Sequence, residues 1–190
     1  MAALPELEVV AKEQLLNTIK MKHLFIIFFT LYSAHSIAQK NIDKLLKQYN
    51  DNGIPYITAE ELAMPKTKAI LLDSREPKEY KISHIKGAIC VGYDNFNIDS
   101  IQKLYPNKGK KIVVYCSLGI RSETIGEKLK EVGYTNVYNL YGGIFEWKNK
   151  NFIVVDSQEK ETENIHAFNK DWSKWLKKGT KVYNTLSKNK

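Results

Sequence analysis

The sequence predicts an α/β fold in which a parallel sheet of about five strands has helices on both faces, with a helical extension at the C-terminal end. Short apolar runs rich in β-branched residues recur along the chain, and helical spacing or capping signals follow them. Strands that alternate with helices in this way form parallel sheets that are covered on both faces. The 190 residues are 43% hydrophobic and 26% charged, a globular composition with room for one full domain.

The N-terminal region has the features of an export signal. Residues 24–32 form a short apolar block, and small residues, Ser36 and Ala38, precede the polar residue at a possible cleavage position. We therefore expect residues 1–38 to contain an N-terminal extension and a signal peptide, with cleavage after Ala38 and a periplasmic or secreted protein. The block is shorter than the ~20 residues of a transmembrane helix, and a core helix or an uncleaved anchor is the alternative. Translation is expected to start at Met21.

The first half of the chain supplies several alternating elements. Residues 39–53 are predicted as a helical lead-in that ends at the turn Asp51-Asn52-Gly53, and residues 54–155 as the domain. The predicted elements are a strand at 56–57, a helix opened by a Thr58-to-Glu61 capping box, a strand at 69–72, a helical turn at 76–82 beginning with Pro77, a strand at 88–91 and a helix at 98–105.

The second half continues the alternation. Residues 112–115 are predicted as a buried strand, and a helix follows Arg121 until Gly133. A strand at 136–140 and a helix from Gly142-Gly143 to Trp147 complete the domain. The strand ends at Asp73, Cys90 and Cys116 should face one rim, because ligands bind at the carboxyl ends of parallel strands.

The loop from Cys116 to Arg121 joins a strand to a helix and is suited to hold an anion. Successive N–H groups and the helix dipole form a concave cradle there. A helix N-terminus and a nearby arginine can lower a thiol pKa from about 8.5 to roughly 3.5–7.5, and the thiolate is the nucleophile. Cys116 is therefore the predicted catalytic residue, with an inert buried cysteine as the alternative. The predicted substrate-binding residues are Ser117, Leu118, Gly119, Ile120, Arg121 and Ser122.

Three motifs in this order resemble those of the rhodanese-like sulfurtransferases. The stretch CSLGIRS at 116–122 is similar to the active-site loop C-x-x-G-x-R-S of that family. LDSREPKEYKISHIKGA at 72–88 is similar to D-x-R-x-x-x-E-[FY]-x-x-G-H-I-x-G-A, with Ser83 where the family usually has glycine. YGGIFEW at 141–147 is similar to the closing G-G-x-x-x-W, and the resemblance covers about residues 54–155.

The resemblance implies a sulfurtransferase of the thiosulfate sulfurtransferase type. The Cys116 thiolate would take the outer sulfur of a donor such as thiosulfate, release sulfite, and pass the sulfur from a persulfide to cyanide or a thiol. The C-x4-R loop is one residue shorter than the C-x5-R loop of related phosphatases and arsenate reductases, which favours sulfur over phosphate. Without a basic residue at 117 or 118, the donor stays open.

Other positions in the matching motifs have supporting roles by the same resemblance. Asp73 and Arg75 are expected to pair and orient the site, and Glu79 and His84 to serve packing and capping. Arg121 is expected to hold an anionic donor or, alternatively, to pair with a carboxylate.

No cofactor and no metal are predicted, because two cysteines and four scattered histidines lack ligand spacing. The lysines behind the net charge of +8 are also scattered, so we expect a small sulfur-containing anion or a thiol as partner, not nucleic acid, and a monomer. Two other functions stay open: an extracytoplasmic thiol/disulfide redox protein using Cys116 with Cys90, or a non-catalytic rhodanese-fold binding module. Cys90 is alternatively a small buried hydrophobe.

Residues 156–190 are predicted to be a C-terminal extension with one aromatic helix. Phe168, Trp172, Trp175 and Leu176 lie at helical spacing. We expect this helix to pack onto the domain, and the alternative is a peripheral membrane or protein contact. His166 precedes it and is expected to be structural.

Overall fold

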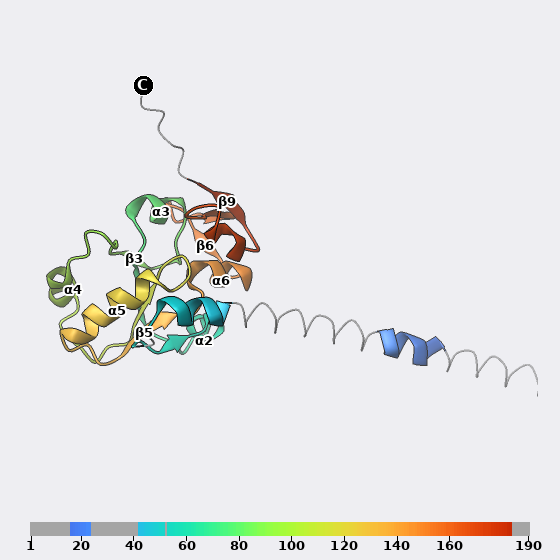
Figure 1. Cartoon of the computed structure of the whole chain (residues 1–190), viewed down its shortest axis with the longest axis horizontal. Coiled ribbons are helices and arrows are strands. Elements are labelled where there is room, and N and C mark those ends of the chain that lie inside the picture. The colour runs from blue at the N-terminus through green and yellow to red at the C-terminus, as the bar shows by residue number, and fades with distance from the viewer. Residues whose placement is uncertain (1–15, 24–41, 52, 184–190) are drawn as a thin grey trace, which may run out of the picture. The chain divides into compact units, whose positions relative to one another are not determined.

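The computed structural model describes residues 16–23, 42–51 and 53–183 (Figure 1). The chain divides into two compact units, residues 1–45 and 46–190, and the first contains a helical segment at 16–23. The apolar block, the predicted cleavage position after Ala38 and Asn52 of the predicted turn lie outside the described residues. Within the described ranges, no helix combines the length and apolar character that crossing a membrane requires.

A five-stranded parallel sheet forms the centre of the second unit, which confirms the predicted α/β fold. Parallel neighbours need crossover connections, which helices provide here. Across the sheet the strands are β1 (Tyr56–Ile57), β5 (Val137–Leu140), β4 (Ile112–Tyr115), β2 (Ile70–Asp73) and β3 (Ile89–Cys90). The helices are α2 (Ala59–Ala63), α3 (Pro77–Ile82), α4 (Ile98–Leu104), α5 (Arg121–Glu131) and α6 (Gly143–Asn149).

The central strand β4 is buried along its whole length. Successive side chains of a strand point to opposite faces, so both faces of the sheet must be covered. Ile112 and Val114 pack in a core cluster with Ile125 and Leu129 of α5, and Figure 1 shows α4 and α5 side by side in that part of the molecule. On the other face, the Tyr115 hydroxyl accepts the N–H of Ile85 at 3.1 Å. The loop after β4 therefore starts from a fixed strand end.

Local signals form the helix ends that the sequence predicts. The Thr58 hydroxyl accepts the N–H of Glu61 at 3.1 Å, and the Glu61 carboxylate accepts the N–H of Thr58 at 2.9 Å, which completes the capping box of α2. Pro77 begins α3. Gly133 follows α5 with φ of 94°, a conformation that favours glycine and ends the helix.

The C-terminal extension is not the aromatic helix that the spacing predicts. Its described residues contain one 3-10 turn, η1 (Trp172–Trp175), and the parallel strand pair β8 (Asn164–His166) with β9 (Thr180–Val182). A further strand, β7 (Glu161–Thr162), pairs antiparallel with β6 (Val154–Val155) at the end of the predicted domain. Phe168 has φ of 62°, which a right-handed helix does not allow. The Asn169 side chain accepts the N–H of Trp172 at 2.9 Å, and the Ser173 hydroxyl donates to the Lys170 carbonyl at 2.8 Å. Such local bonds compete with a longer helix, so residues 168–176 do not form the continuous helix that their spacing predicts.

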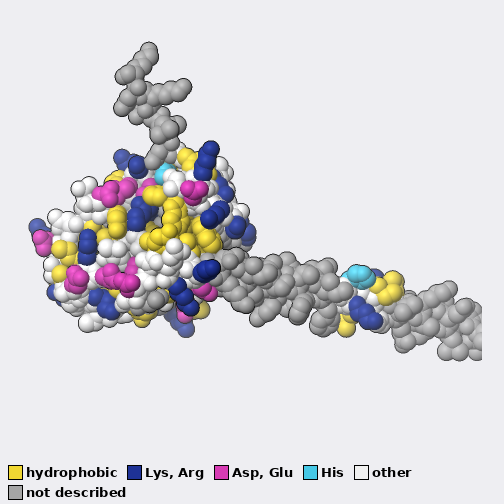
Figure 2. Space-filling view, in the orientation of Figure 1, with side chains coloured by type: hydrophobic (Ala, Val, Ile, Leu, Met, Phe, Trp, Pro, Cys, Tyr) yellow, Lys and Arg dark blue, Asp and Glu magenta, His cyan; other side chains and the backbone are white. Residues whose placement is uncertain are grey.

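Charged side chains of both signs are interspersed over the visible face of the molecule. Figure 2 shows lysine and arginine side chains next to acidic ones, with an apolar area between them. A mixed surface of this kind favours solubility.

Candidate active site

The Cys116 sulfur lies at the end of β4, inside the loop that leads to α5. The Gly119 N–H points at the sulfur, with the nitrogen 3.1 Å from Sγ, and the Ser122 hydroxyl oxygen lies 3.6 Å from it. Cys116 is only 2% exposed. The predicted loop residues therefore surround the thiol, and backbone donors face it.

The surroundings of Cys116 favour its ionised form. Burial raises the pKa of the thiol, but the positive charge of Arg121 and the backbone N–H groups of Ser122, Gly119 and Leu118 lower it more, and the pKa lies below its ordinary value. A thiolate is the nucleophilic form of cysteine. The site can therefore perform nucleophilic chemistry at sulfur.

Two buried asparagines hold the Gly119 peptide in place. The Gly119 carbonyl accepts hydrogen bonds from the side chains of Asn139 at 2.8 Å and Asn50 at 2.9 Å. Gly119 itself has φ of 108°, where a side chain is strained. The Ser122 hydroxyl also donates to the Asn139 side-chain oxygen at 2.7 Å. Sequence reasoning missed both asparagines, although a polar residue inside the apolar strand 136–140 is a visible signal for Asn139.

The double glycine at 142–143 lets α6 approach the back of the loop. The N–H of Ile144 donates to the Cys116 carbonyl at 2.9 Å, and the N–H of Phe145 donates to the Ser117 carbonyl at 3.1 Å. A Cβ atom on Gly143 would overlap the Cys116 and Ser117 backbone. The close contact between α6 and the loop therefore requires a glycine at this position.

Arg121 makes a two-point ion pair with Glu79 of α3. Its guanidinium donates to the two carboxylate oxygens at 2.7 and 2.8 Å and to the Ser117 hydroxyl at 3.2 Å. Glu79 is 1% exposed; burial raises its pKa, but hydrogen bonds from Arg121 and His166 lower it well below its usual range. Glu79 also accepts the N–H of Glu76, which is the expected capping role. Arg121 therefore has the second of its two expected roles, the pairing with a carboxylate.

Asp73 and Arg75 pair with each other and do not line the cavity at Cys116. Both side chains are fully buried, with 2.6 Å between Nη2 of Arg75 and Oδ2 of Asp73. The same Nη2 donates to the Ser83 carbonyl at 2.7 Å. Ser83 has φ of −169°, an extended conformation that any residue adopts, so the departure from glycine there costs no backbone strain. The pair therefore fixes the chain between β2 and β3.

A cavity of about 130 Å³ lies over Cys116. Its walls are loop residues 116–118, 120 and 121, together with Phe168 and Trp172 of the extension. The Arg121 guanidinium carbon is 5.1 Å from the centre of the Phe168 ring, and Trp172 packs edge-on against Tyr49 with ring centres 5.7 Å apart. Sequence reasoning missed both as site residues because their spacing predicted a helix.

His166 is a further neighbour of the site that sequence reasoning treated as structural. It is buried on β8, with Nδ1 3.6 Å from the Glu79 carboxylate. The N–H of Phe168 lies 3.2 Å from the same nitrogen. His166 therefore connects the extension to the Arg121–Glu79 pair.

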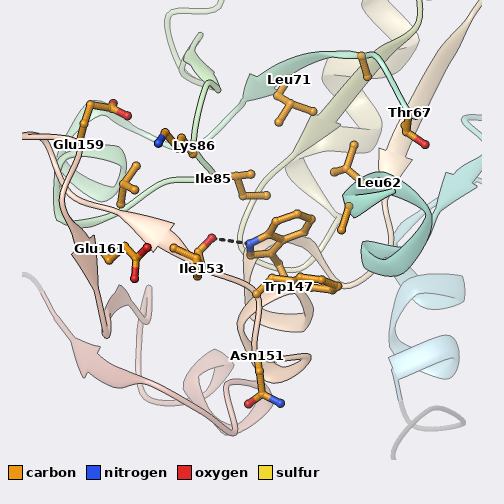
Figure 3. A pocket seen from close by; sticks show the side chains of 14 residues that line it. Leu62, Thr67, Leu71, Ile85, Lys86, Trp147, Asn151, Ile153, Glu159 and Glu161 are labelled. Atoms are coloured by element: carbon orange, nitrogen blue, oxygen red, sulfur yellow. Dashed lines mark hydrogen bonds between the residues drawn. The ribbon is translucent and has the colours of Figure 1, made fainter. Parts of the chain in front are cut away.

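A larger cavity, about 640 Å³, contains none of the predicted site residues (Figure 3). In Figure 3 the Trp147 indole lies in its middle and donates its N–H to the Ile153 carbonyl, at 2.9 Å. Its lining is mostly apolar, with Lys86, Glu159 and Glu161 as the charged members. The candidate nucleophile Cys116 lines the smaller cavity, which is therefore the candidate active site.

The two cysteines are both free thiols: Cys90 lies on β3 and Cys116 directly follows β4, and these two strands are not neighbours. Strand β2 separates them, because Asp73 pairs with Cys90 on one side and with Tyr115 on the other. Adjacent strands are ~4.8 Å apart, which separates these positions by roughly 10 Å, whereas a disulfide needs Cα atoms within about 7 Å. Burial and the Asp73 charge also raise the pKa of Cys90. The arrangement does not support a Cys90–Cys116 disulfide.

Among the described residues, histidine, cysteine and acidic side chains form no group of three or more that could hold a metal ion. The candidate site contains the thiol, its backbone donors, Arg121 and the apolar walls of the cavity.

The fold and the site define a class of protein in which a buried cysteine follows the central strand of a parallel sheet and backbone amides point at its sulfur. The family described as the rhodanese-like domain matches residues 58–150. This part of the chain is a rhodanese-like domain.

Named relatives give a more specific comparison. The chain is 33% identical over 131 residues to the tRNA uridine(34) hydroxylase of Erwinia tasmaniensis, covering 59% of this chain and 37% of the relative. It is 32% identical over 136 residues to the protein of the same name from Legionella pneumophila (strain Corby), covering 63% and 53%. The chain thus spans between 37% and 53% of the length of these two curated relatives.

A solved structure has the same fold. The thiosulfate sulfurtransferase from Pseudomonas aeruginosa matches with a TM-score of 0.50 and 24% identity, over 65% of this chain and 23% of that chain. At this identity the match concerns the fold alone.

These comparisons support a rhodanese-family enzyme but not the thiosulfate sulfurtransferase type specifically. They also correct the expected location. The expectation of a periplasmic or secreted protein is wrong, because the relatives carry the name of an enzyme that acts on tRNA, a cytoplasmic molecule.

Proposed function

We propose that this protein is a sulfurtransferase in which Cys116 carries a sulfane sulfur, as a persulfide, from a donor to a thiophilic acceptor. The observation that carries this proposal is the Cys116 sulfur itself, buried at the end of β4 with the Gly119 N–H directed at it from 3.1 Å. Donors in this position stabilise negative charge on sulfur before and after a sulfur atom is added. The lowered pKa of Cys116 supplies the thiolate that starts the reaction.

The reaction divides into two balanced steps. In the first, the Cys116 thiolate attacks the outer sulfur of a donor such as thiosulfate; a new S–S bond forms, the donor S–S bond breaks, and sulfite leaves with the electron pair. In the second, the acceptor attacks the outer sulfur of the persulfide, and Cys116 leaves as a thiolate. A persulfide is a reversible modification of cysteine, so each cycle restores the enzyme.

The size of the cavity over Cys116 fits a small donor. Its ~130 Å³ lies below the roughly 300–1,000 Å³ of pockets for drug-sized ligands. Arg121 contributes to its wall a guanidinium that the pair with Glu79 holds in place. Leu118 and Ile120 supply apolar walls.

Intact-mass measurement tests the proposal. The purified protein is treated with thiosulfate, desalted and compared with Cys116→Ser and, as a matched control, Cys90→Ser. The proposal expects a gain of one sulfur atom in the wild type and in Cys90→Ser, removed by cyanide, and no gain in Cys116→Ser. Thiosulfate is one donor among several, so the assay is repeated with a low-molecular-weight persulfide. No sulfur gain from either donor would exclude the proposal.

The names of the curated relatives favour a second candidate, the modification of a uridine in tRNA. The specific observation is the identity of 33% over 131 residues with the Erwinia tasmaniensis protein. Hydroxylation is a two-electron oxidation, so the test is incubation with tRNA and with dioxygen as the oxidant, followed by mass spectrometry of the nucleosides, with Cys116→Ser as the control. A hydroxylated uridine that depends on Cys116 would favour this candidate, and an unchanged nucleoside profile would count against it.

A further inference from the structure

The wall of the Cys116 cavity includes two residues that lie outside the family match. The family match ends at residue 150, whereas Phe168 and Trp172 belong to the C-terminal extension. This chain therefore adds part of its own C-terminal segment to the site.

Both aromatic side chains are held in position by specific contacts. Phe168 adopts φ of 62°, a conformation that bulky residues rarely take, and its ring lies over the Arg121 guanidinium at 5.1 Å. Trp172 packs against Tyr49, and the Asn169 side-chain oxygen accepts the backbone N–H of Trp172 at 2.9 Å. Strained backbone that the surroundings hold in place is characteristic of functional sites.

These side chains narrow the approach to the sulfur. Phe168 is 44% exposed, so its ring forms part of the rim, and Leu118 and Ile120 lie on the loop side of the same cavity. An acceptor must reach the outer sulfur of a Cys116 persulfide through this space. Substituents on the carbon next to the attacking sulfur would meet the aromatic rings.

We propose that Phe168 and Trp172 are specificity-determining residues that restrict the Cys116 persulfide to slim sulfur acceptors, such as thiols with an unbranched carbon next to sulfur. This inference rests on the proposed sulfurtransferase function and names its acceptor class. In the step concerned, the acceptor thiolate forms a bond to the outer sulfur, the persulfide S–S bond breaks, and Cys116 leaves as a thiolate. The acceptor becomes a persulfide, and no external oxidant or reductant is needed.

Single-turnover discharge of preloaded protein tests this inference. Cysteine and penicillamine are the probes, because they carry the same ionisable groups and differ by two methyl groups on the carbon that bears sulfur. The measured quantity is the ratio of the two discharge rates, and cyanide serves as a slim reference acceptor. The variants are Phe168→Ala and Trp172→Ala, with Tyr183→Ala as an exposed aromatic control in the same extension.

In the wild type, discharge to cysteine should be much faster than discharge to penicillamine. Because steric discrimination of about one methylene group in an apolar pocket is worth roughly 10–200-fold, each alanine variant should lower the ratio at least about tenfold, while Tyr183→Ala leaves it unchanged. Phe168→Leu and Trp172→Phe, which keep an apolar side chain, should give intermediate ratios and replace the alanine variants if those do not fold. Unchanged ratios in loaded variants would overturn this inference alone. Failure of the wild type to load sulfur from any donor would overturn the proposed function and this inference with it.

Discussion

The Arg121 guanidinium donates to both carboxylate oxygens of Glu79, at 2.7 and 2.8 Å, and thereby joins α5 to α3 directly beside the Cys116 loop. The carboxylate is buried and the guanidinium is mostly so. Planar two-point pairing fixes the orientation of an arginine better than a single contact would. The positive charge that lowers the pKa of Cys116 is therefore held at a defined position.

Replacing Arg121 should make Cys116 less reactive at neutral pH. In Arg121→Gln the positive charge is lost and the Glu79 carboxylate remains, so the pKa of Cys116 should rise, and the pH at which alkylation by iodoacetamide reaches half its maximum should rise with it. The rate is measured against pH in a Cys90→Ser background. Lys128→Gln removes a charge from the other end of α5 and should leave the profile unchanged. An identical profile for Arg121→Gln would show that Arg121 does not act on the thiol.

Removing the Glu79 charge should destabilise the fold most at neutral pH. Breaking a buried ion pair by removing one partner costs ~3 kcal/mol, and this should appear in urea unfolding of Glu79→Gln. The folded-state pKa of Glu79 lies below its unfolded value of about 4.3, so its stabilisation is complete above that pH and is lost as the pH falls toward the folded value. The gap between wild type and variant should therefore narrow below about pH 4.

A surface pair provides the control for that measurement. Lys150 contacts Glu60 at 2.8 Å, and both side chains are partly exposed. Glu60→Gln should cost less than ~1 kcal/mol, as exposed pairs usually do. A Glu79→Gln effect no larger than this would contradict the assigned role of the Arg121–Glu79 pair.

Gly143 should not accept even a methyl group. Gly143→Ala places a Cβ against the Cys116 carbonyl in a residue with φ of 56°, so strain and overpacking together should cost about 2–5 kcal/mol. Gly92 has φ of 69°, and a methyl group there would meet no atom within 4 Å beyond its chain neighbours, so Gly92→Ala should cost only the backbone strain of about 1–2 kcal/mol. Chemical denaturation of both variants gives the comparison, and equal losses would argue against a close contact at Gly143.

Asn139 should support both the fold and the reactivity of Cys116. Asn139→Leu removes the donors to the Gly119 carbonyl and to the Glu123 carboxylate, where Asn139 donates at 2.9 Å. Unsatisfied buried groups cost ~1–3 kcal/mol, and a looser Gly119 peptide should slow alkylation of Cys116. Asn136→Leu, on the surface of the same region, should change stability by less than about 0.5 kcal/mol and leave alkylation unchanged.

Most of the sheet could be predicted from the sequence because each element carries its own local signal. The Thr58–Glu61 capping box, Pro77 at the start of α3 and Gly133 after α5 all define helix ends by interactions within a few residues. The buried strand 112–115 has the apolar continuity of a strand covered on both faces. Local chemistry and the final fold agree in these elements.

The extension could not be predicted in the same way because its structure depends on distant pairing. The aromatic residues have helical spacing, but β8 and β9 pair in parallel across an intervening loop, and that loop contains only one 3-10 turn. The spacing of apolar residues carries no information on which distant strands pair. For the same reason the contacts of Phe168 and Trp172 with the cavity were not predictable.

The loop of the candidate site could be predicted from the sequence, but the residues that surround the loop could not. Cys116, Gly119 and Arg121 lie together because they are close in sequence, and a strand end joined to a helix defines their geometry. The sequence predicts only capping and packing for Glu79, because nothing near it in the chain shows that it meets Arg121, 42 residues away. Asn50, Asn139 and His166 likewise reach the site only through the tertiary fold.

The separation of Cys90 from Cys116 by β2 means that this chain has no resolving thiol of its own. The sequence contains two cysteines, and the strand between them keeps the second outside bonding range of the first. Under the proposed function, an oxidised or sulfur-loaded Cys116 would be restored by a separate reductant or acceptor molecule and not by Cys90. The concentration of that molecule would then determine the lifetime of the modified cysteine.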